Sequence, residues 1–422
     1  MSEHKSTMNP AIHLLVLTVF IDLIGFGIII PLLPLYADTF HASPAIIGGL
    51  MATFSFWQFI FAPILGRWSD RIGRRPVLLV SLGGTILGYV VLAIADRPIF
   101  TEHHLPWLWG LPVGLVLLFL SRTIDGVSGG NISTAQAYIA DITTPEDRIK
   151  GMGMIGAAFG LGFIFGPVIG SVLARYGFHW PAIAAGTLAI GNWIWAYKAL
   201  PESRKPDSAP VGRTFSVSAI TRTLTNPLLG KLIVLVFVAT FAFAILETTL
   251  TMYLKDRMGV DAAVAARRTG PYFAYIGFLM AFIQGWAIRR LKGKNLETIL
   301  VAGGTLSLAA GMFGMALISN TFVLLFPLAL VAFGSGFVNP SLTSLISRRA
   351  DPNEMGLTLG ASQGMSGLAR IAGPLAGGLL YGKVTGGLSL DPGRPYLAAA
   401  VIMGLAFLMA LTVHGERNAT PA

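Results

Sequence analysis

The sequence contains no cysteine among its 422 residues. This absence excludes disulfide bonds and thiolate metal sites. Charge is also scarce: 12% of the residues are Asp, Glu, Lys or Arg, whereas 54% are hydrophobic and the mean hydropathy is +0.69. A soluble globular protein needs a more charged surface than this composition supplies. The chain is therefore expected to lie in a membrane.

Signatures of several catalytic classes are missing as well. No Gly-Lys-Ser/Thr nucleotide loop occurs, and the seven histidines have no metal-ligand spacing. A membrane enzyme would need a reactive constellation, and a lipid scramblase a polar lipid-facing groove. We find neither pattern, so we expect no enzyme activity, no cofactor and no bound metal.

Twelve apolar runs are long enough to cross a bilayer, which takes about 20 helical residues. They lie near 12–36, 44–65, 77–95, 111–135, 153–174, 180–199, 228–254, 269–288, 296–318, 321–346, 357–381 and 395–413. We therefore expect an all-α integral membrane protein with twelve transmembrane helices. The first run is full length and has no small-residue cleavage site, so it is expected to remain as a span.

The basic residues indicate an orientation. The net charge is +10, and 20 of the 30 Lys and Arg residues fall in inner segments if the N-terminus is cytoplasmic. Eight fall outside, and four of these lie between the seventh and eighth spans: Lys255, Arg257, Arg267 and Arg268. The charge reports topology, and no nucleic-acid partner is indicated. No outer loop holds an Asn-X-Ser/Thr acceptor, which favours a bacterial inner membrane with both termini cytoplasmic.

The chain reads as two halves. A polar break divides it into an N-terminal six-helix bundle (1–200), a cytoplasmic linker (201–227) and a C-terminal six-helix bundle (228–422). Gly166-Pro167-x2-Gly170 returns as Gly373-Pro374-x2-Gly377, an offset of 207 residues. Duplicated transporters bind substrate near the midplane between their repeats. We expect a monomer in the lipid bilayer that carries a small molecule and protons.

A second repeated pair supports the duplication. Gly126 and Asn131 return as Gly334 and Asn339, at an offset of 208 residues. Glycine and proline leave one helix side bare, so Gly162, Gly166, Pro167 and Gly170, with Gly373 and Pro374, are expected to pack helices closely or let them slide.

Five charged residues fall within spans: Asp22, Arg122, Asp125, Glu247 and Arg370. Each is costly in lipid and so carries a functional hypothesis. Arg122 and Asp125 are three residues apart, close enough on one helical face to pair. If Arg122 serves both Asp22 and Asp125, one carboxylate is left weakly paired and can exchange a proton near neutral pH.

Glu247 has three open roles. It could bind a cationic substrate, carry a proton, or pair with Arg370 as a packing device. We assign it, with Asp22, Arg122 and Asp125, to the proton-coupling set.

The segment 66–76 concentrates charge between two apolar runs, and its glycines permit tight turns. Such a segment cannot lie in lipid, so it is a cytoplasmic loop. Its Gly-x3-Asp-Arg-x-Gly-Arg-Arg pattern resembles the loop between spans 2 and 3 of major facilitator superfamily transporters. Three further patterns match the twelve-span drug:proton antiporters of that group: Gly25-x5-Pro31-x2-Pro34, Arg122-Thr-Ile-Asp125-Gly126, and Gly153-x8-Gly162-x3-Gly166-Pro167-x2-Gly170.

Within that group the chain looks most like the tetracycline efflux proteins, through Asp22-Leu-Ile-Gly25 and Ala-Tyr138-Ile-Ala-Asp141-Ile-Thr. The resemblance implies that Arg122 governs proton movement. It also implies a cytoplasmic gate in which Asp70, Arg71 and Arg74 latch with Asp141; we add Gly66 and Gly73 to this gate.

We therefore expect export of a small amphipathic drug or metabolite by substrate:proton antiport with alternating access, and thus a contribution to antibiotic resistance. Proton-coupled uptake of a small metabolite uses the same fold and remains the alternative. The spans contain few polar side chains and many aromatic ones, which favours a hydrophobic substrate. The residues expected to contact it are Gln58, Phe61, Tyr275, Asn339, Gln363 and Arg370.

Overall fold

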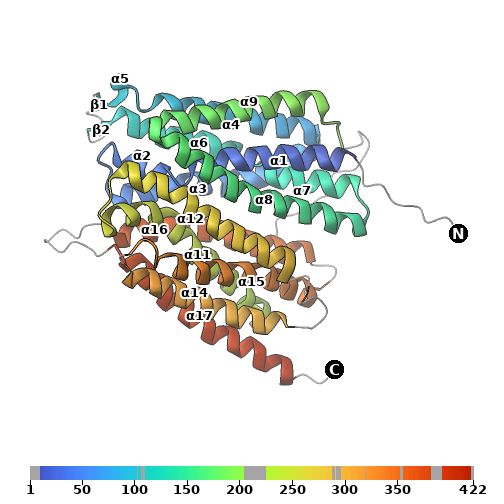
Figure 1. Cartoon of the computed structure of the whole chain (residues 1–422). Helices are drawn as coiled ribbons and strands as arrows, with labels where there is room; N and C mark the ends of the chain where they lie inside the picture. The colour runs from blue at the N-terminus through green and yellow to red at the C-terminus, as the bar shows by residue number, and fades with distance from the viewer. Residues whose placement is uncertain are drawn as a thin grey trace. The chain divides into compact units, whose positions relative to one another are not determined.

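The computed structural model of the chain describes residues 10–101, 103–105, 110–203, 225–287, 290, 296–318, 320–351, 355–381 and 392–419. Helices make up nearly all of this part (Figure 1). Among the described residues the only strands are the two-residue β1 (His104–Leu105) and β2 (Leu111–Pro112), which pair antiparallel.

The first half holds α1 (Pro10–Ile29), α2 (Leu33–Asp38), α3 (Pro44–Ile72), α4 (Arg74–Ile94), α5 (Pro98–Thr101), α6 (Val113–Ser128), α7 (Asn131–Ile142), α8 (Pro145–Leu173), the 3-10 turn η2 (Ala174–Tyr176) and α9 (His179–Ala199). The second half holds α11 (Pro227–Arg257), α12 (Ala262–Phe282), the π-helical turn η3 (Ile283–Ala287), α14 (Glu297–Leu317), α15 (Leu325–Arg349), α16 (Met355–Tyr381) and α17 (Arg394–Ala419).

Each of the twelve expected spans corresponds to a helix or a pair of helices, so the all-α prediction is confirmed. Two spans are broken where the sequence predicts one helix. The first divides into α1 and α2 at 30–32, where Pro31 cannot continue the backbone ladder, and the fourth divides into α6 and α7 at Gly129–Gly130. Within the described part of the chain, nine spans meet a strict length and hydropathy test; α9, α12 and α16 are not among them.

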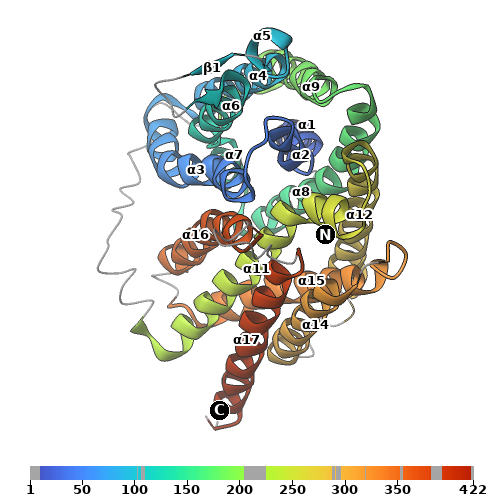
Figure 2. The ribbon, with the colours of Figure 1, turned by 90° about the vertical axis from the view of Figure 1, so that its left-hand side faces the viewer.

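Contacts between helices divide the chain into two units. Unit 1 comprises residues 1–29 and 57–213, and unit 2 comprises residues 30–56 and 214–422. In unit 1, α1 lies between α8 and α9, while α4 packs on α6 and α9 (Figures 1 and 2). Leu15, Leu23, Tyr138 and Ala158 belong to the apolar core that joins α1, α7 and α8.

Unit 2 repeats the packing order of unit 1. There α11 packs on α16 and α17, as α1 packs on α8 and α9, and α14 packs on α15 and α17, as α4 packs on α6 and α9. The two sequence repeats therefore correspond to two equivalent six-helix arrangements. The predicted boundaries of the linker stay a prediction, because residues 204–224 lie outside the described part.

Residues 30–56 come from the first half of the sequence but group with unit 2. The Thr251 hydroxyl on α11 donates to the Pro31 carbonyl at 2.7 Å, and Lys255 forms an ion pair with Asp38 of α2. These contacts hold α2 against the C-terminal part of α11. The division of contacts thus falls inside the first two spans.

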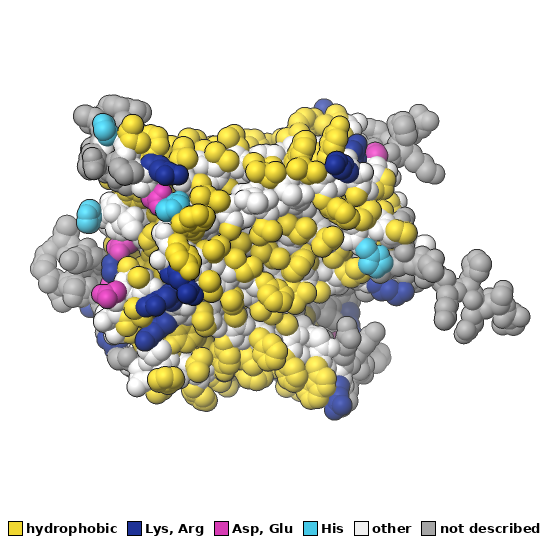
Figure 3. All heavy atoms as spheres, turned by 45° about the horizontal axis from the view of Figure 1, so that its top comes forward, with side chains coloured by type: hydrophobic (Ala, Val, Ile, Leu, Met, Phe, Trp, Pro, Cys, Tyr) yellow, Lys and Arg dark blue, Asp and Glu magenta, His cyan; other side chains and the backbone are white. Residues whose placement is uncertain are grey.

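The molecular surface fits a bilayer. Hydrophobic side chains dominate the face shown in Figure 3, and charged side chains lie mainly toward its left and right edges. Leu87, Phe165, Leu379 and Leu405 are among the large apolar side chains that the helices expose. Such a surface is stable next to lipid chains and unstable in water.

Candidate functional site

The break between α6 and α7 places backbone and side-chain polar groups inside unit 1. The Gly129 N–H donates to Gly126 O at 3.1 Å, so the end of α6 tightens into a turn. The Gln58 side-chain amide donates to Gly129 O at 3.0 Å and holds the break from α3. Asn131 then opens α7, where the helix N-terminus favours negative charge.

That negative charge is supplied by Asp22 of α1. The Asn131 side-chain nitrogen donates to Asp22 Oδ2, while Asn131 Oδ1 accepts the Ile132 N–H at 2.8 Å. The second bond fixes the orientation of the amide, so its nitrogen must face the carboxylate. Asp22 Oδ1 is buried and has no hydrogen-bond partner among the described residues. One oxygen is thus held and the other is open to a proton.

Arg122 and Asp125 form the pair that their spacing predicts. Arg122 Nη1 lies 3.2 Å from Asp125 Oδ2, and both side chains are almost fully buried, at 1% and 6% exposure. The Thr85 hydroxyl of α4 donates to Asp125 Oδ1 at 3.1 Å. Arg122 Nη2 donates to the Ser121 hydroxyl at 3.3 Å, whereas in the part of the chain described its Nε makes no hydrogen bond. A buried guanidinium in this state has capacity for another acceptor.

The predicted gate is centred on Arg74. Its guanidinium meets Asp70 Oδ1 at 2.7 Å, Asp141 Oδ2 at 2.8 Å and the Ser69 hydroxyl at 2.6 Å. Arg74 is 6% exposed, whereas the side chains of Asp70 and Asp141 are 23% and 28% exposed, so the guanidinium is shielded from water and the carboxylates are partly open to it. The planar fork of arginine suits several fixed acceptors, which a lysine could not reach together.

Glu202 completes this cluster and was not predicted. Its carboxylate accepts the Arg74 N–H at 2.9 Å and the Arg75 N–H at 3.0 Å, and so caps the start of α4. Gly73 precedes the helix with φ 107°, and a Cβ there would lie 2.5 Å from Glu202 Oε2. The glycine is needed both for its backbone conformation and for the approach of the carboxylate.

The first residues of the expected linker therefore contact the predicted gate cluster. Pro201 O accepts the Tyr138 hydroxyl at 2.6 Å, and the Ser203 hydroxyl donates to Asp141 Oδ2 at 3.4 Å. Two predicted gate residues do not contact this cluster. Arg71 is exposed and has no partner among the residues described, and a side chain at Gly66 would meet open space.

The glycines of α8 form a close helix crossing with α1. A Cβ at Gly166 would lie 2.6 Å from Gly27 Cα, and one at Gly162 would lie 2.8 Å from Leu23 Cβ. Pro167 contacts the same place on α1, and Gly170 meets Ile28 O. In unit 2, a Cβ at Gly373, beside Pro374, would lie 2.7 Å from Ala244 Cβ. A side chain at Gly162, Gly166, Gly170 or Gly373 would therefore meet the neighbouring helix, while a role in sliding stays a prediction.

The remaining predicted residues do not form one hydrogen-bonded set. Glu247 of α11 and Arg370 of α16 are near enough for their charges to interact, but no ion pair of 4.0 Å or less joins them. Gln363 and Arg370 are seven residues apart and both exposed, so they share a face of α16. The other predicted contacts are Asn339, exposed on α15, Tyr275, half-buried on α12, and Phe61, whose ring centre lies 5.9 Å from that of Trp57.

Sequence reasoning missed Asn131 as a partner of Asp22 and Glu202 as a helix cap. An asparagine inside an apolar run was a usable signal for the first. Glu202 lies in Leu-Pro-Glu-Ser, and the polarity of this segment was interpreted as the start of a linker.

Two repeated six-helix arrangements with polar clusters inside the spans are typical of secondary transporters. The profile of the Major Facilitator Superfamily matches residues 15–374, and the chain belongs to this superfamily. It is therefore a multi-pass membrane transporter and not an enzyme.

Named relatives agree with this assignment. The chain is 30% identical to the class C tetracycline resistance protein of Escherichia coli, over 88% of this chain and 90% of that protein. It is 27% identical to multidrug resistance protein 2 of Bacillus subtilis, over 96% and 95% of the two chains. The crystal structure of the human organic anion transporter MFSD10 (TETRAN) is similar over 96% of this chain and 100% of that one, at 25% identity and a TM-score of 0.69.

Proposed function

We propose that the protein exports a small amphipathic molecule, such as an antibiotic, in exchange for protons. Its relation to tetracycline and multidrug resistance proteins supports this substrate class. The observation that carries proton coupling is Asp22, an intramembrane carboxylate with one oxygen held by Asn131 and the other without a partner in the described part of the chain. Carboxylates in such positions commonly serve proton relays.

Arg122 gives the coupling a physical form. In this conformation it pairs with Asp125 and retains unused donors. A conformational change that carries Arg122 toward Asp22 would stabilise the ionised carboxylate and expel its proton. The reverse movement would let Asp22 take up a proton from the other side. Glu247 is proposed as a second charged group that meets a cationic substrate or a proton.

Substrate is proposed to contact exposed or half-buried side chains of the spans. These are the residues expected from the sequence, Gln58, Phe61, Tyr275, Asn339, Gln363 and Arg370. The Gln58 amide nitrogen is engaged by Gly129 O, so its side-chain oxygen is the atom we assign to substrate.

The gate cluster is proposed to lie on the cytoplasmic side, with both termini, in a bacterial inner membrane. Positive charge in the 66–76 loop supports this orientation. We also propose that the monomer is the transporting unit, because one chain carries both repeats. Reporter fusions at Gly110 and at the C-terminus test the topology: an active cytoplasmic reporter at Gly110 would reverse it.

The function is tested in inverted membrane vesicles with an acidic interior. Tetracyclines and lipophilic cations are screened for collapse of the pH gradient, compared with vesicles lacking the protein. Substrate-dependent proton release supports antiport. No response across the panel, together with gradient-driven uptake of a polar metabolite into right-side-out vesicles, would instead establish the uptake symporter.

A further inference from the structure

Arginines gather where the charge pattern predicts the outer side of the membrane. The preference of basic residues for the inner side of a membrane explains those in inner segments. It does not explain the four basic residues that lie on the outer side between the seventh and eighth spans. Lys255 forms an ion pair with Asp38, and Arg257 also has an interaction partner. Arg267 and Arg268, in the second turn of α12, remain to be accounted for.

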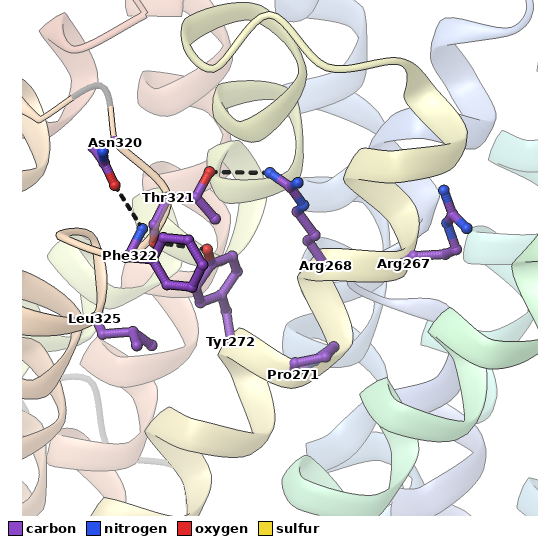
Figure 4. A pocket seen from close by; sticks show the side chains of 8 residues that line it. All are labelled: Arg267, Arg268, Pro271, Tyr272, Asn320, Thr321, Phe322 and Leu325. Atoms are coloured by element: carbon purple, nitrogen blue, oxygen red, sulfur yellow. Dashed lines mark hydrogen bonds between the residues drawn. The ribbon is translucent and has the colours of Figure 1, made fainter.

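The two arginines line a hollow in unit 2. Its volume is about 540 Å³, and Figure 4 shows the side chains that line it. The lining residues are Arg267, Arg268, Pro271 and Tyr272 of α12, with Asn320, Thr321, Phe322 and Leu325 from the segment that leads into α15. No carboxylate is among these described lining residues, and the two arginines make the hollow positively charged. An anion is the complementary ligand.

Hydrogen bonds already fix the walls of this hollow. Arg268 Nη1 donates to the Thr321 hydroxyl at 3.0 Å, and the Tyr272 hydroxyl donates to Thr321 O at 2.9 Å. Asn320 Oδ1 accepts the Phe322 N–H at 2.9 Å and closes the turn. Arg267 is exposed, and its guanidinium has no hydrogen bond or ion pair among the described residues. The site is therefore preformed and retains one guanidinium for a ligand.

Exposed aromatic side chains lie at the hollow, on Phe322, and four residues further along the same segment, on Phe326. Phe322 is 83% exposed and Phe326 is 69% exposed. At the end of a membrane span, exposed aromatic rings lie at the level of the lipid headgroups. A soluble anion would gain nothing from these rings, whereas the chains and glycerol of a lipid would cover them. The arginines and the rings together select a molecule that is anionic at one end and apolar at the other.

We propose that this hollow binds the phosphate of an anionic phospholipid in the outer leaflet. Arg267 and Arg268 hold the phosphate oxygens, and the apolar part of the lipid packs on Phe322 and Leu325. The site shares no residue with the proposed proton-coupling set or gate, so it does not depend on the transport direction, and its assignment to the outer leaflet rests on the proposed topology. Its expected effect is to tie the start of α12 and the segment before α15 to the membrane.

The test uses the full chain in neutral detergent, titrated with phosphatidylglycerol or phosphatidylcholine while the thermal unfolding midpoint is followed. Phosphatidylglycerol is expected to raise the midpoint more. Arg267→Gln should raise the half-saturating concentration of phosphatidylglycerol by about fivefold, because one arginine near an anionic lipid surface contributes about that factor. Arg267→Gln is preferred as the first variant since its guanidinium supports no internal bond; Arg268→Gln is added second.

Arg175→Gln is the matched control. Arg175 is an exposed arginine of unit 1 that lies 5.9 Å from the Tyr176 ring, and its loss should leave the titration unchanged. An unaltered titration in both hollow variants would overturn the proposal. Inorganic phosphate is the second probe: if it alone raises the midpoint as much as phosphatidylglycerol does, the site binds a soluble anion and the lipid assignment is wrong.

Discussion

The Asn131 side chain donates a hydrogen bond to the Asp22 carboxylate across 109 residues of sequence. The amide cannot turn away, because its oxygen is taken by the Ile132 N–H at 2.8 Å. The contact brings an intramembrane carboxylate to the N-terminus of α7, where the helix dipole favours negative charge. The hydrogen bond stabilises an ionised Asp22, which has no ion pair with a basic side chain among the described residues.

Asn131→Ala should slow proton-coupled transport by about tenfold or more. A hydrogen bond to a charged group contributes about 1.5–3 kcal/mol, and 1.4 kcal/mol corresponds to a factor of ten. The rate of substrate-dependent proton movement in proteoliposomes measures this. Asn192→Ala is the matched control, since Asn192 of α9 donates to the Thr18 carbonyl of α1 at 2.9 Å and has no hydrogen bond to a carboxylate among the described residues. Equal loss of coupling in both variants would contradict a specific role for Asn131.

Arg74→Lys should impair turnover strongly, whereas Arg71→Lys should leave it within about twofold. The Arg74 guanidinium bridges Asp70, Asp141 and Ser69, and a single ammonium cannot meet all three. Arg71 makes no such contact in the described structure. Initial transport rates at matched protein levels compare the two variants. A strong defect in Arg71→Lys would show that the gate uses it in another conformation.

Asp70→Asn tests whether the gate also binds substrate. The change removes one charged partner of Arg74 and leaves Asp141 in place. Turnover should fall while equilibrium binding of substrate to the purified protein changes little. A large loss of binding would indicate that Asp70 contacts substrate directly.

Glu202→Ala should destabilise the start of α4 by about 1–2 kcal/mol, the usual contribution of a helix cap. Its carboxylate is the acceptor for two backbone N–H groups that have no intrahelical partner. Hydrogen exchange at the Arg74 and Arg75 amides measures the loss locally. Glu202→Gln keeps one acceptor oxygen, so its exchange rates should lie between those of the unaltered protein and those of Glu202→Ala. Unchanged exchange in Glu202→Ala would mean that water replaces the cap without cost.

Gly166→Ala should destabilise the α1–α8 crossing by about 1–3 kcal/mol, as overpacking does in well-packed interiors. The added Cβ would lie 2.6 Å from Gly27 Cα, and backbone cannot move aside as a flexible side chain can. Gly153→Ala on the same helix is the control, because a Cβ there meets nothing within 4 Å. Thermal unfolding in detergent should separate the two variants. Similar midpoints would show that α1 and α8 do not approach this closely.

The sequence predicts the helices well because lipid imposes a simple requirement. Every span must be apolar over about 20 residues, so composition alone marks it. The breaks at 30–32 and 129–130 were not predicted, although Pro31 and the pair Gly129–Gly130 are helix breakers. The apolar run continues across the first break. The second break falls in a stretch of mainly small or polar, uncharged residues, 128–134, so neither break interrupts a predicted span.

Local pairs were predicted and distant pairs were not. Arg122 and Asp125 are adjacent on one helical face, so their contact follows from spacing. The bond from Asn131 to Asp22 depends on how α1 and α7 pack, which no local pattern encodes. The predicted gate was found only in part. Resemblance to a family indicated the contact of Arg74 with Asp141, whereas the contact of Glu202 with Arg74 required the three-dimensional structure.

The most direct test of the account is proton coupling in Asp22→Asn, measured in proteoliposomes with and without an imposed pH gradient. The amide is nearly isosteric and cannot release a proton, so the variant should exchange labelled substrate across the membrane but fail to accumulate it against its gradient. Gradient-driven accumulation equal to that of the unaltered protein would contradict the assignment of Asp22 as the proton carrier.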